Sequence, residues 1–485
     1  MRVLLINPSA RDANGMGRMG LLFKPIPPLG VAAIAGSLLD AGVETGLIDQ
    51  FGANLTNREV AALVSRERIN LVGITALTAS MGNILRLIKE IRRSSPTVRI
   101  VLGNVHATVY HRELVADGTA DFVIRGEGEK AMVKLCRAIE AGASFESVGS
   151  LTWRKGDEVV VNELEPPLEM NSLPFPAWHL LDVNKYRTMP LLGVNRPMLH
   201  IQASRGCPYR CSFCSQEVMH SGFRKRSIES VLGEMEHFYR KFSVDYFIFT
   251  DAYFPFSSSH GIEFADALIK SGLSRKVKWI CETRVDKVSA PMLRRLRESG
   301  LELIMFGFES GSQAVLNGVN KRQSLDTARN AARWAREAGI RTLGLFILGL
   351  PGETKETCEE TVRFACELNP DFAKFNIAIP YPGSQFFDEW IKRRGEMPEF
   401  ERFNSWFDPR KSKNELLFVP DGMTSVELLS LQRRAMLRFW ARPQQVLRTL
   451  KNGGVTPKNV ALGAYALISD YLSTTLQKKS AQSDA

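Results

Sequence analysis

The 485-residue chain has no uninterrupted apolar stretch of 18 residues, the minimum for a helix that crosses a membrane. Its first apolar run, residues 3–6, is too short for a secretory signal peptide. Cysteine is scarce, with seven residues in all, and the odd number argues against a framework of disulfides. We therefore expect a cytoplasmic protein that folds without disulfides and without a membrane-spanning helix.

Internal repeats are also absent, and low-complexity sequence is confined to the last few residues. With 44% hydrophobic and 24% charged residues, the composition is that of a globular protein. Hydrophobic cores stop growing near about 250–300 residues, so a chain of this length is expected to form two or three domains. The net charge of +11 is spread over basic clusters that alternate with acids, which favours solvated helix faces. No nucleic-acid partner is predicted.

The first 145 residues alternate short apolar runs with amphipathic stretches. The expected strands are 3–6, 43–48, 71–76, 99–103 and 122–125, and the expected helices are 29–41, 84–94 and 129–141. This pattern predicts a doubly wound α/β domain over residues 1–145. Polar or glycine residues follow most of the strands, at the sheet edge where such domains bind ligands.

Residues 146–197 form the expected connector, with a hairpin over 151–161 and a proline-rich segment after it. A second series of strands and helices then predicts a partial (β/α)6 barrel over 198–400. Its expected strands are 200–203, 246–250, 277–281, 303–308, 341–348 and 372–379. Residues 401–485 are expected to form a helical cap, with one or two helices between 426 and 450.

Three of the seven cysteines, Cys207, Cys211 and Cys214, form a C-x3-C-x2-C pattern directly after the first expected barrel strand. Thiolates at this spacing can bind three irons of a [4Fe–4S] cluster and leave the fourth iron open. A zinc site is the alternative, with His200 or His220 as the fourth ligand. Zinc sites usually take their ligands in two pairs, and no second pair lies nearby, so the spacing favours the cluster.

This loop resembles the C-x3-C-x-aromatic-C signature of the radical S-adenosylmethionine (SAM) superfamily, with Phe213 in the aromatic position. The resemblance implies that the three cysteines are the catalytic, cluster-binding residues and that SAM chelates the open iron. It also implies an electron donor such as flavodoxin or ferredoxin. Further residues stand at the ends of later strands, where the family binds SAM: Asp251, Arg284, Glu309, Ser310 and Gly349.

These later residues also have structural interpretations. Arg284 can pair with Glu282 instead of binding the SAM carboxylate. Glu309 and Ser310 can form the turn after their strand, although polar side chains at the mouth of a barrel more often contact a ligand. Gly349 can serve only to turn the chain towards the next helix.

Several segments of the N-terminal domain resemble the cobalamin-binding domain of cobalamin-dependent radical SAM proteins: 27–30, 73–75 with Ser80, 103–108 and 125–129. The resemblance implies cobalamin contacts from Thr75, Ser80, Gly103, His106, Gly126 and Glu127. The D-x-H-x-x-G motif of cobalamin mutases is absent, so His106 is not assigned as an axial ligand of cobalt. A domain for another nucleotide is the alternative, but no G-x-G-x-x-G follows the first strand.

The proteins that this chain resembles are largely class B radical SAM methyltransferases, with an anaerobic porphyrin ring cyclase as the exception. We therefore expect methylation of an unactivated carbon in a small, apolar metabolite. The alternatives are a radical oxidative cyclase that acts on a tetrapyrrole and a non-enzymatic cobalamin sensor. Near the C-terminus, arginines interleave with apolar residues such as Leu437 and Leu447. This pattern suits either peripheral membrane contact, with a lipid or tetrapyrrole substrate, or a helix packed on the barrel.

Overall fold

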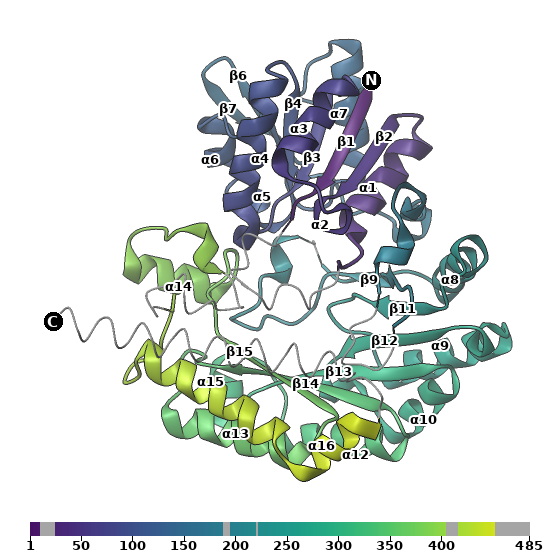
Figure 1. Ribbon diagram of the computed structural model, residues 1–485, viewed down its shortest axis with the longest axis vertical. Coiled ribbons are helices and arrows are strands. Elements are labelled where there is room, and N and C mark those ends of the chain that lie inside the picture. The colour runs from purple at the N-terminus through teal and green to yellow at the C-terminus, as the bar shows by residue number, and fades with distance from the viewer. Residues whose placement is uncertain (10–24, 188–194, 220–221, 404–415, 452–485) are drawn as a thin grey trace.

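The computed structural model describes residues 1–9, 25–187, 195–219, 222–403 and 416–451. Two sheets stand one above the other, the N-terminal sheet at the top of Figure 1 and the barrel sheet below it. The last helices pack at the bottom of this view, on the side of the barrel away from the N-terminal domain. The arrangement confirms the predicted fold class of an α/β N-terminal domain, a partial barrel and a C-terminal helical extension.

The N-terminal domain contains β1 (Arg2–Asn7), α1 (Leu29–Asp40), β2 (Glu44–Asp49), α2 (Gln50–Ala53), α3 (Asn57–Arg66), β3 (Leu71–Thr75), α4 (Met81–Ser94), β4 (Arg99–Gly103), α5 (Val105–Val109), α6 (His111–Ala116), β5 (Phe122–Ile124) and α7 (Glu129–Ala141). Successive residues of β1 face opposite sides of the sheet. Val3 and Leu5 pack in a cluster with residues of α1 and α7. Leu4 and Ile6 pack in another cluster with residues of α3 and α4, so helices cover both faces.

The hairpin that was expected within the connector lies instead in the N-terminal sheet. Its strands β6 (Leu151–Lys155) and β7 (Glu158–Val161) continue the order β2-β1-β3-β4-β5-β6-β7 in antiparallel fashion. They pair backbone groups of β5 that would otherwise form an exposed edge. We therefore propose that the first domain ends after Val161 rather than at 145, and we keep the later boundaries at 197 and 400.

The barrel contains β8 (Leu199–Ile201), α8 (Ile228–Phe242), β11 (Tyr246–Phe249), α9 (Ser258–Lys270), β12 (Lys278–Thr283), α10 (Ala290–Glu298), β13 (Leu301–Glu309), α11 (Gln313–Gly318), α12 (Leu325–Glu337), β14 (Arg341–Leu348), α13 (Lys355–Leu368) and β15 (Phe372–Ile377). All six strands run parallel in the order β15-β14-β13-β12-β11-β8. Spatial order follows chain order, and the sheet is open between β8 and β15. A two-stranded ribbon, β9 (Ser204–Arg205) with β10 (Arg224–Lys225), flanks the cysteine loop.

The barrel domain ends with α14 (Gln385–Arg394), and the C-terminal segment beyond residue 400 contains α15 (Ser425–Trp440) and α16 (Pro443–Lys451). Helix α15 packs on the barrel, where Phe439 is fully buried and Gln432 Nε2 donates to the carbonyl of Phe375 at 2.8 Å. Leu437 and Leu447 remain 67% and 60% exposed. Among the helices that the structure describes, none has both the length and the apolar character to cross a membrane.

Candidate active site between the two domains

A cavity of about 400 Å³ lies between the N-terminal sheet and the barrel. Thr75, Gly103 and Gly126, at or just after the ends of β3, β4 and β5, line it from the N-terminal side. From the barrel side, Gln216 and Met219 line it shortly after Cys214. The cavity thus joins the ligand-binding edge of a doubly wound sheet to the cysteine loop.

Four of the six residues expected to contact cobalamin line this cavity: Thr75, Gly103, Gly126 and Glu127. Gly103 and Gly126 leave room at the strand ends because they carry no side chain, which fits a large planar ligand at this edge. The other two, Ser80 and His106, are buried behind the strand ends and are not part of the lining.

His106 packs within the N-terminal domain and against a later segment. Its ring lies 4.7 Å from that of Tyr110 and 4.9 Å from that of Phe400, and Nδ1 is 3.2 Å from Thr78 Oγ1. Burial lowers the pKa of His106 to about 4. The imidazole is therefore neutral over the physiological pH range.

The neutral state of His106 makes stability depend on pH. The unfolded chain takes up a proton near pH 6.5, whereas the folded chain resists protonation down to about pH 4. Stability from this residue is therefore present above pH 6.5 and is lost as the pH falls towards 4, by about 1.4 kcal/mol per unit. Urea unfolding of wild type and His106→Gln at several pH values should give a shallower pH dependence for the variant. Parallel profiles would contradict the prediction.

The cysteine loop is held at several points by the barrel. The amide of Ser212 donates to the carbonyl of Val319 at 3.1 Å, and its carbonyl accepts from the amide of Phe386 at 2.8 Å. Asn320 Nδ2 donates to the carbonyl of Arg210 at 2.7 Å. The loop therefore has a defined backbone path that carries the three cysteines.

The donor set fits a cluster better than a single metal ion. Metal binding must displace the proton of each thiol. Across the described ranges, no three His, Cys, Asp or Glu side chains converge on one metal position. Ligands of a cubane each bind a different iron and need not converge. His200 is buried and hydrogen-bonded to the backbone of Pro27, and His220 lies outside the described residues.

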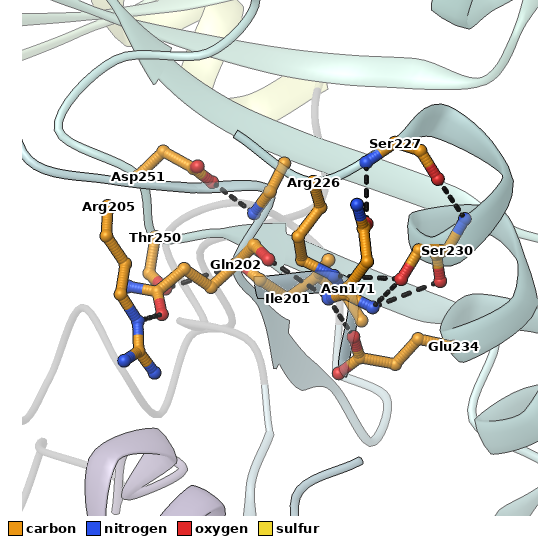
Figure 2. Close-up of polar contacts among 11 residues, drawn as sticks. Asn171, Ile201, Gln202, Arg205, Arg226, Ser227, Ser230, Glu234, Thr250 and Asp251 are labelled. Atoms are coloured by element: carbon orange, nitrogen blue, oxygen red, sulfur yellow. Dashed lines mark hydrogen bonds and ion pairs between the residues drawn. The ribbon is translucent and has the colours of Figure 1, made fainter. Parts of the chain in front are cut away.

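Asp251 connects the end of β11 to the segment before the cysteine loop. Its carboxylate accepts from the amide of Ala203 at 3.2 Å, and Figure 2 shows Asp251 in this position. It also accepts from the hydroxyl of Ser204 at 2.6 Å. Burial raises the pKa of Asp251 to about 7, while these hydrogen bonds lower it. The side chain of Asp251 therefore fixes the backbone segment that leads into the cysteine loop.

Glu309 forms a buried ion pair with Lys321, with 2.6 Å between Oε1 and Nζ. Its φ of +62° is unusual for a residue with a side chain and marks local strain at the mouth of the barrel. A Cβ at Gly307 would lie only 2.6 Å from Glu309 Oε1, so the glycine makes room for the pair. Lys321, whose ammonium lies 6.0 Å from the centre of the Phe213 ring, was not identified from the sequence.

Arg284 is a structural partner of the cysteine loop. It pairs with Asp286 at 2.8 Å rather than with Glu282, donates to the carbonyl of Lys321, and stacks 3.7 Å from the ring centre of Tyr209. This arrangement orders the loop from the β12 side.

The remaining two candidates also have protein partners. Ser310 lies 3.1 Å from the hydroxyl of Thr361. The amide of Gly349, at φ +82°, donates to Glu353 at 2.5 Å, and Glu353 also accepts from Leu350. The turn interpretation therefore accounts for the contacts of Gly349.

A network of buried charges joins the two domains beside the cavity; we call it the interdomain network. Arg205 donates to Glu127 at 3.0 Å and also pairs with Glu129, and Arg224 pairs with the same Glu127. Glu127 was expected as a cobalamin contact, and the structure shows it engaged with two arginines. A separate pair, Arg226 with Glu234, stiffens the barrel wall of the cavity (Figure 2).

Comparison with known proteins identifies both domains. Residues 22–136 match the model of the B12 binding domain, and residues 201–365 match that of the radical SAM superfamily. The chain is 32% identical to the anaerobic magnesium-protoporphyrin IX monomethyl ester cyclase of Cereibacter sphaeroides, over 91% of this chain and 71% of that protein. It is 29% identical to an uncharacterized methyltransferase of Pyrococcus horikoshii, over 93% of this chain and 95% of that protein.

The fold also matches a solved structure, that of the radical SAM methyltransferase TsrM from Kitasatospora setae. The TM-score is 0.66 at 19% identity, over 94% of this chain and 100% of that chain. The chain belongs to the cobalamin-dependent radical SAM enzymes. Its cofactors are therefore a [4Fe–4S] cluster, SAM and cobalamin, and it needs a small substrate and an electron donor.

Proposed function

We propose that this enzyme methylates an unactivated carbon of a small, apolar metabolite. The observation that carries the proposal is the cavity that runs from the ends of β3, β4 and β5 to the residues after Cys214. When bound, the cluster and SAM supply radical chemistry, and cobalamin carries the methyl group. Both domains line this one space, so a ligand held at the N-terminal sheet edge lies next to the segment that follows the cysteine loop.

Specific roles follow for the site residues. Cys207, Cys211 and Cys214 hold the cluster. Phe213, Glu309 and Ser310 form the SAM site. Asp251 and Arg284 act by ordering the loop, and Gly349 acts by turning the chain after β14. Thr75, Gly103, Gly126 and Glu127 form the cobalamin site, which Ser80 and His106 support from behind.

A radical oxidative cyclase acting on a tetrapyrrole is the second candidate, because the 32% identical relative is named as such a cyclase. Family membership makes the chain an enzyme, so the non-enzymatic sensor is set aside. We further propose flavodoxin or ferredoxin as the electron donor and a cytoplasmic location. Exposed Leu437 and Leu447, near the arginines of α15 and α16, suit peripheral contact with a membrane that holds a lipid or tetrapyrrole substrate.

The experiment that tests the proposal uses the reconstituted holoenzyme with methyl-deuterated SAM, hydroxocobalamin, a reductant and an extract of cells that lack the gene. Methylation is expected to yield a product that carries the labelled methyl group, together with 5′-deoxyadenosine and S-adenosylhomocysteine. Cyclisation would yield 5′-deoxyadenosine and a product that has lost hydrogen, with no label. An unlabelled product would overturn the methyltransferase proposal.

A further inference from the structure

The interdomain network crosses between the domains directly ahead of the cluster ligands. Arg205 stands two residues before Cys207, and both of its carboxylate partners, Glu127 and Glu129, follow β5 in the N-terminal domain. The side chains of Arg205 and Glu129 are only 8% and 6% exposed. Charges this well shielded depend on one another, because each would be costly to leave unpaired.

The segment that carries Arg205 is held from both sides. From the barrel, Asp251 binds the amide of Ala203 and the hydroxyl of Ser204. From the N-terminal domain, Glu127 and Glu129 bind the guanidinium. If the loop that carries Glu127 and Glu129 shifts, it must therefore either move the segment that carries Arg205 or break buried ion pairs.

Backbone packing tightens the same junction. Gly206 has a φ of +81°, and a Cβ there would lie 1.9 Å from the carbonyl oxygen of Gly222. Across the interface, Gly126 has a φ of +68°, and a Cβ there would lie 3.3 Å from the carbonyl oxygen of Met219. Both loops that bear the network are therefore fitted closely to their neighbours.

The network is also a wall of the cavity, since Glu127, Glu129 and Arg205 all line it. An occupant of the cavity that contacts the glutamates therefore acts on the arginine next to the cluster loop. The pair formed by Arg226 and Glu234 lines the same cavity but lies wholly within the barrel, so it does not connect the domains.

We propose that Arg205 is a positioning residue that couples occupancy of the cobalamin cavity to the geometry of the cluster loop. The inference rests on the cofactor sites of the proposed function but not on the identity of the substrate. An arginine suits this role because its planar guanidinium can bind two carboxylates at once, whereas a lysine is a single point charge. Coupling of this kind is reciprocal: SAM bound at the cluster must tighten cobalamin binding as much as cobalamin tightens SAM binding.

The test measures the affinity of the cluster-reconstituted enzyme for hydroxocobalamin by absorbance, with and without SAM. In wild type, SAM is expected to tighten binding by about fivefold or more. In Arg205→Lys, Arg205→Ala and Glu129→Gln, the factor should fall to about one. Arg295→Ala is the control, because it removes an ion pair with Asp266 on the outer helices and should keep the wild-type factor.

A second readout follows amide hydrogen exchange in the absence of SAM. Hydroxocobalamin should slow exchange at residues 126–129 and 203–207 in wild type, but only at 126–129 in Arg205→Lys. The lysine variant keeps the charge, so the test survives if the alanine variant does not fold. The proposal would be overturned if SAM tightened hydroxocobalamin binding in the Arg205 variants as much as in wild type. It would also be overturned if SAM had no effect on that affinity in wild type. Failure of methyl transfer with the coupling intact would count only against the proposed function.

Discussion

Alanine at any one of Cys207, Cys211 or Cys214 is expected to lower SAM cleavage by at least about a thousandfold. Two protein thiolates do not hold a stable cluster, and cleavage depends on an electron from a cluster that contacts SAM. Wild type and variants are reconstituted with iron and sulfide under anaerobic conditions. Iron content and the 5′-deoxyadenosine formed from SAM with a chemical reductant are then measured.

Cys366→Ala is the matched control, since Cys366 is a half-buried cysteine on α13, away from the loop. This variant should bind as much iron as wild type. The loop variants should still bind hydroxocobalamin, because the strand ends that line the N-terminal side of the cavity are unchanged. A loop variant that retains wild-type cleavage would refute the assignment of the cluster ligands.

Gly206→Ala is expected to lower SAM cleavage by roughly a hundredfold even though all three cysteines remain, because displacing the loop by about 1 Å misplaces the reacting groups. The backbone at φ +81° favours glycine, and the new Cβ would lie 1.9 Å from the carbonyl oxygen of Gly222. The ribbon formed by β9 and β10 must then open. Iron content after reconstitution and 5′-deoxyadenosine formation are the measurements.

Gly272→Ala is the control that separates the strain of a positive φ from the clash between the new Cβ and the carbonyl of Gly222. Gly272 has a similar φ of +74°, but a Cβ there would have no neighbour within 4 Å. This variant should lose about 1 kcal/mol of stability and keep its iron and its SAM cleavage. Equal losses of cleavage in the two variants would show that the contact with Gly222 does not place the loop.

Most of the fold was predictable because buried strands are continuous apolar runs. The expected strands 71–76 and 341–348 differ from β3 and β14 by at most one residue. Helix α3 was missed, although Thr56 and Glu59 form a capping box that signals its start. The hairpin was predicted, but its place at the edge of the N-terminal sheet was not. The sequence pattern of a hairpin predicts that its two strands pair with each other, but it does not indicate which further strand they join.

The candidate site was predictable in part. The cysteine loop is a local pattern, and so are the turns that bring Thr75, Gly103 and Gly126 to the cavity. His106 looked equivalent in sequence, but the chain after Gly103 turns its ring into the domain rather than into the cavity. Local motifs thus identify strand ends, whereas the direction of a side chain depends on its packing.

Local sequence patterns therefore suffice for the two domain types and for the cofactors that the family uses, because each pattern lies within one short segment. The proposed assignment of the cluster ligands rests on such a pattern too. The contacts between segments depend on how the domains pack. Arg205 meets Glu127 and Glu129, which are 78 and 76 residues away, and Lys321 meets Glu309 beneath the mouth of the barrel. No periodicity or spacing encodes these pairings. The pairs of Arg205 form only when the two domains meet, and the pair of Lys321 with Glu309 forms only when the barrel folds, because the charges must be brought together before their attraction can offset the cost of burying them.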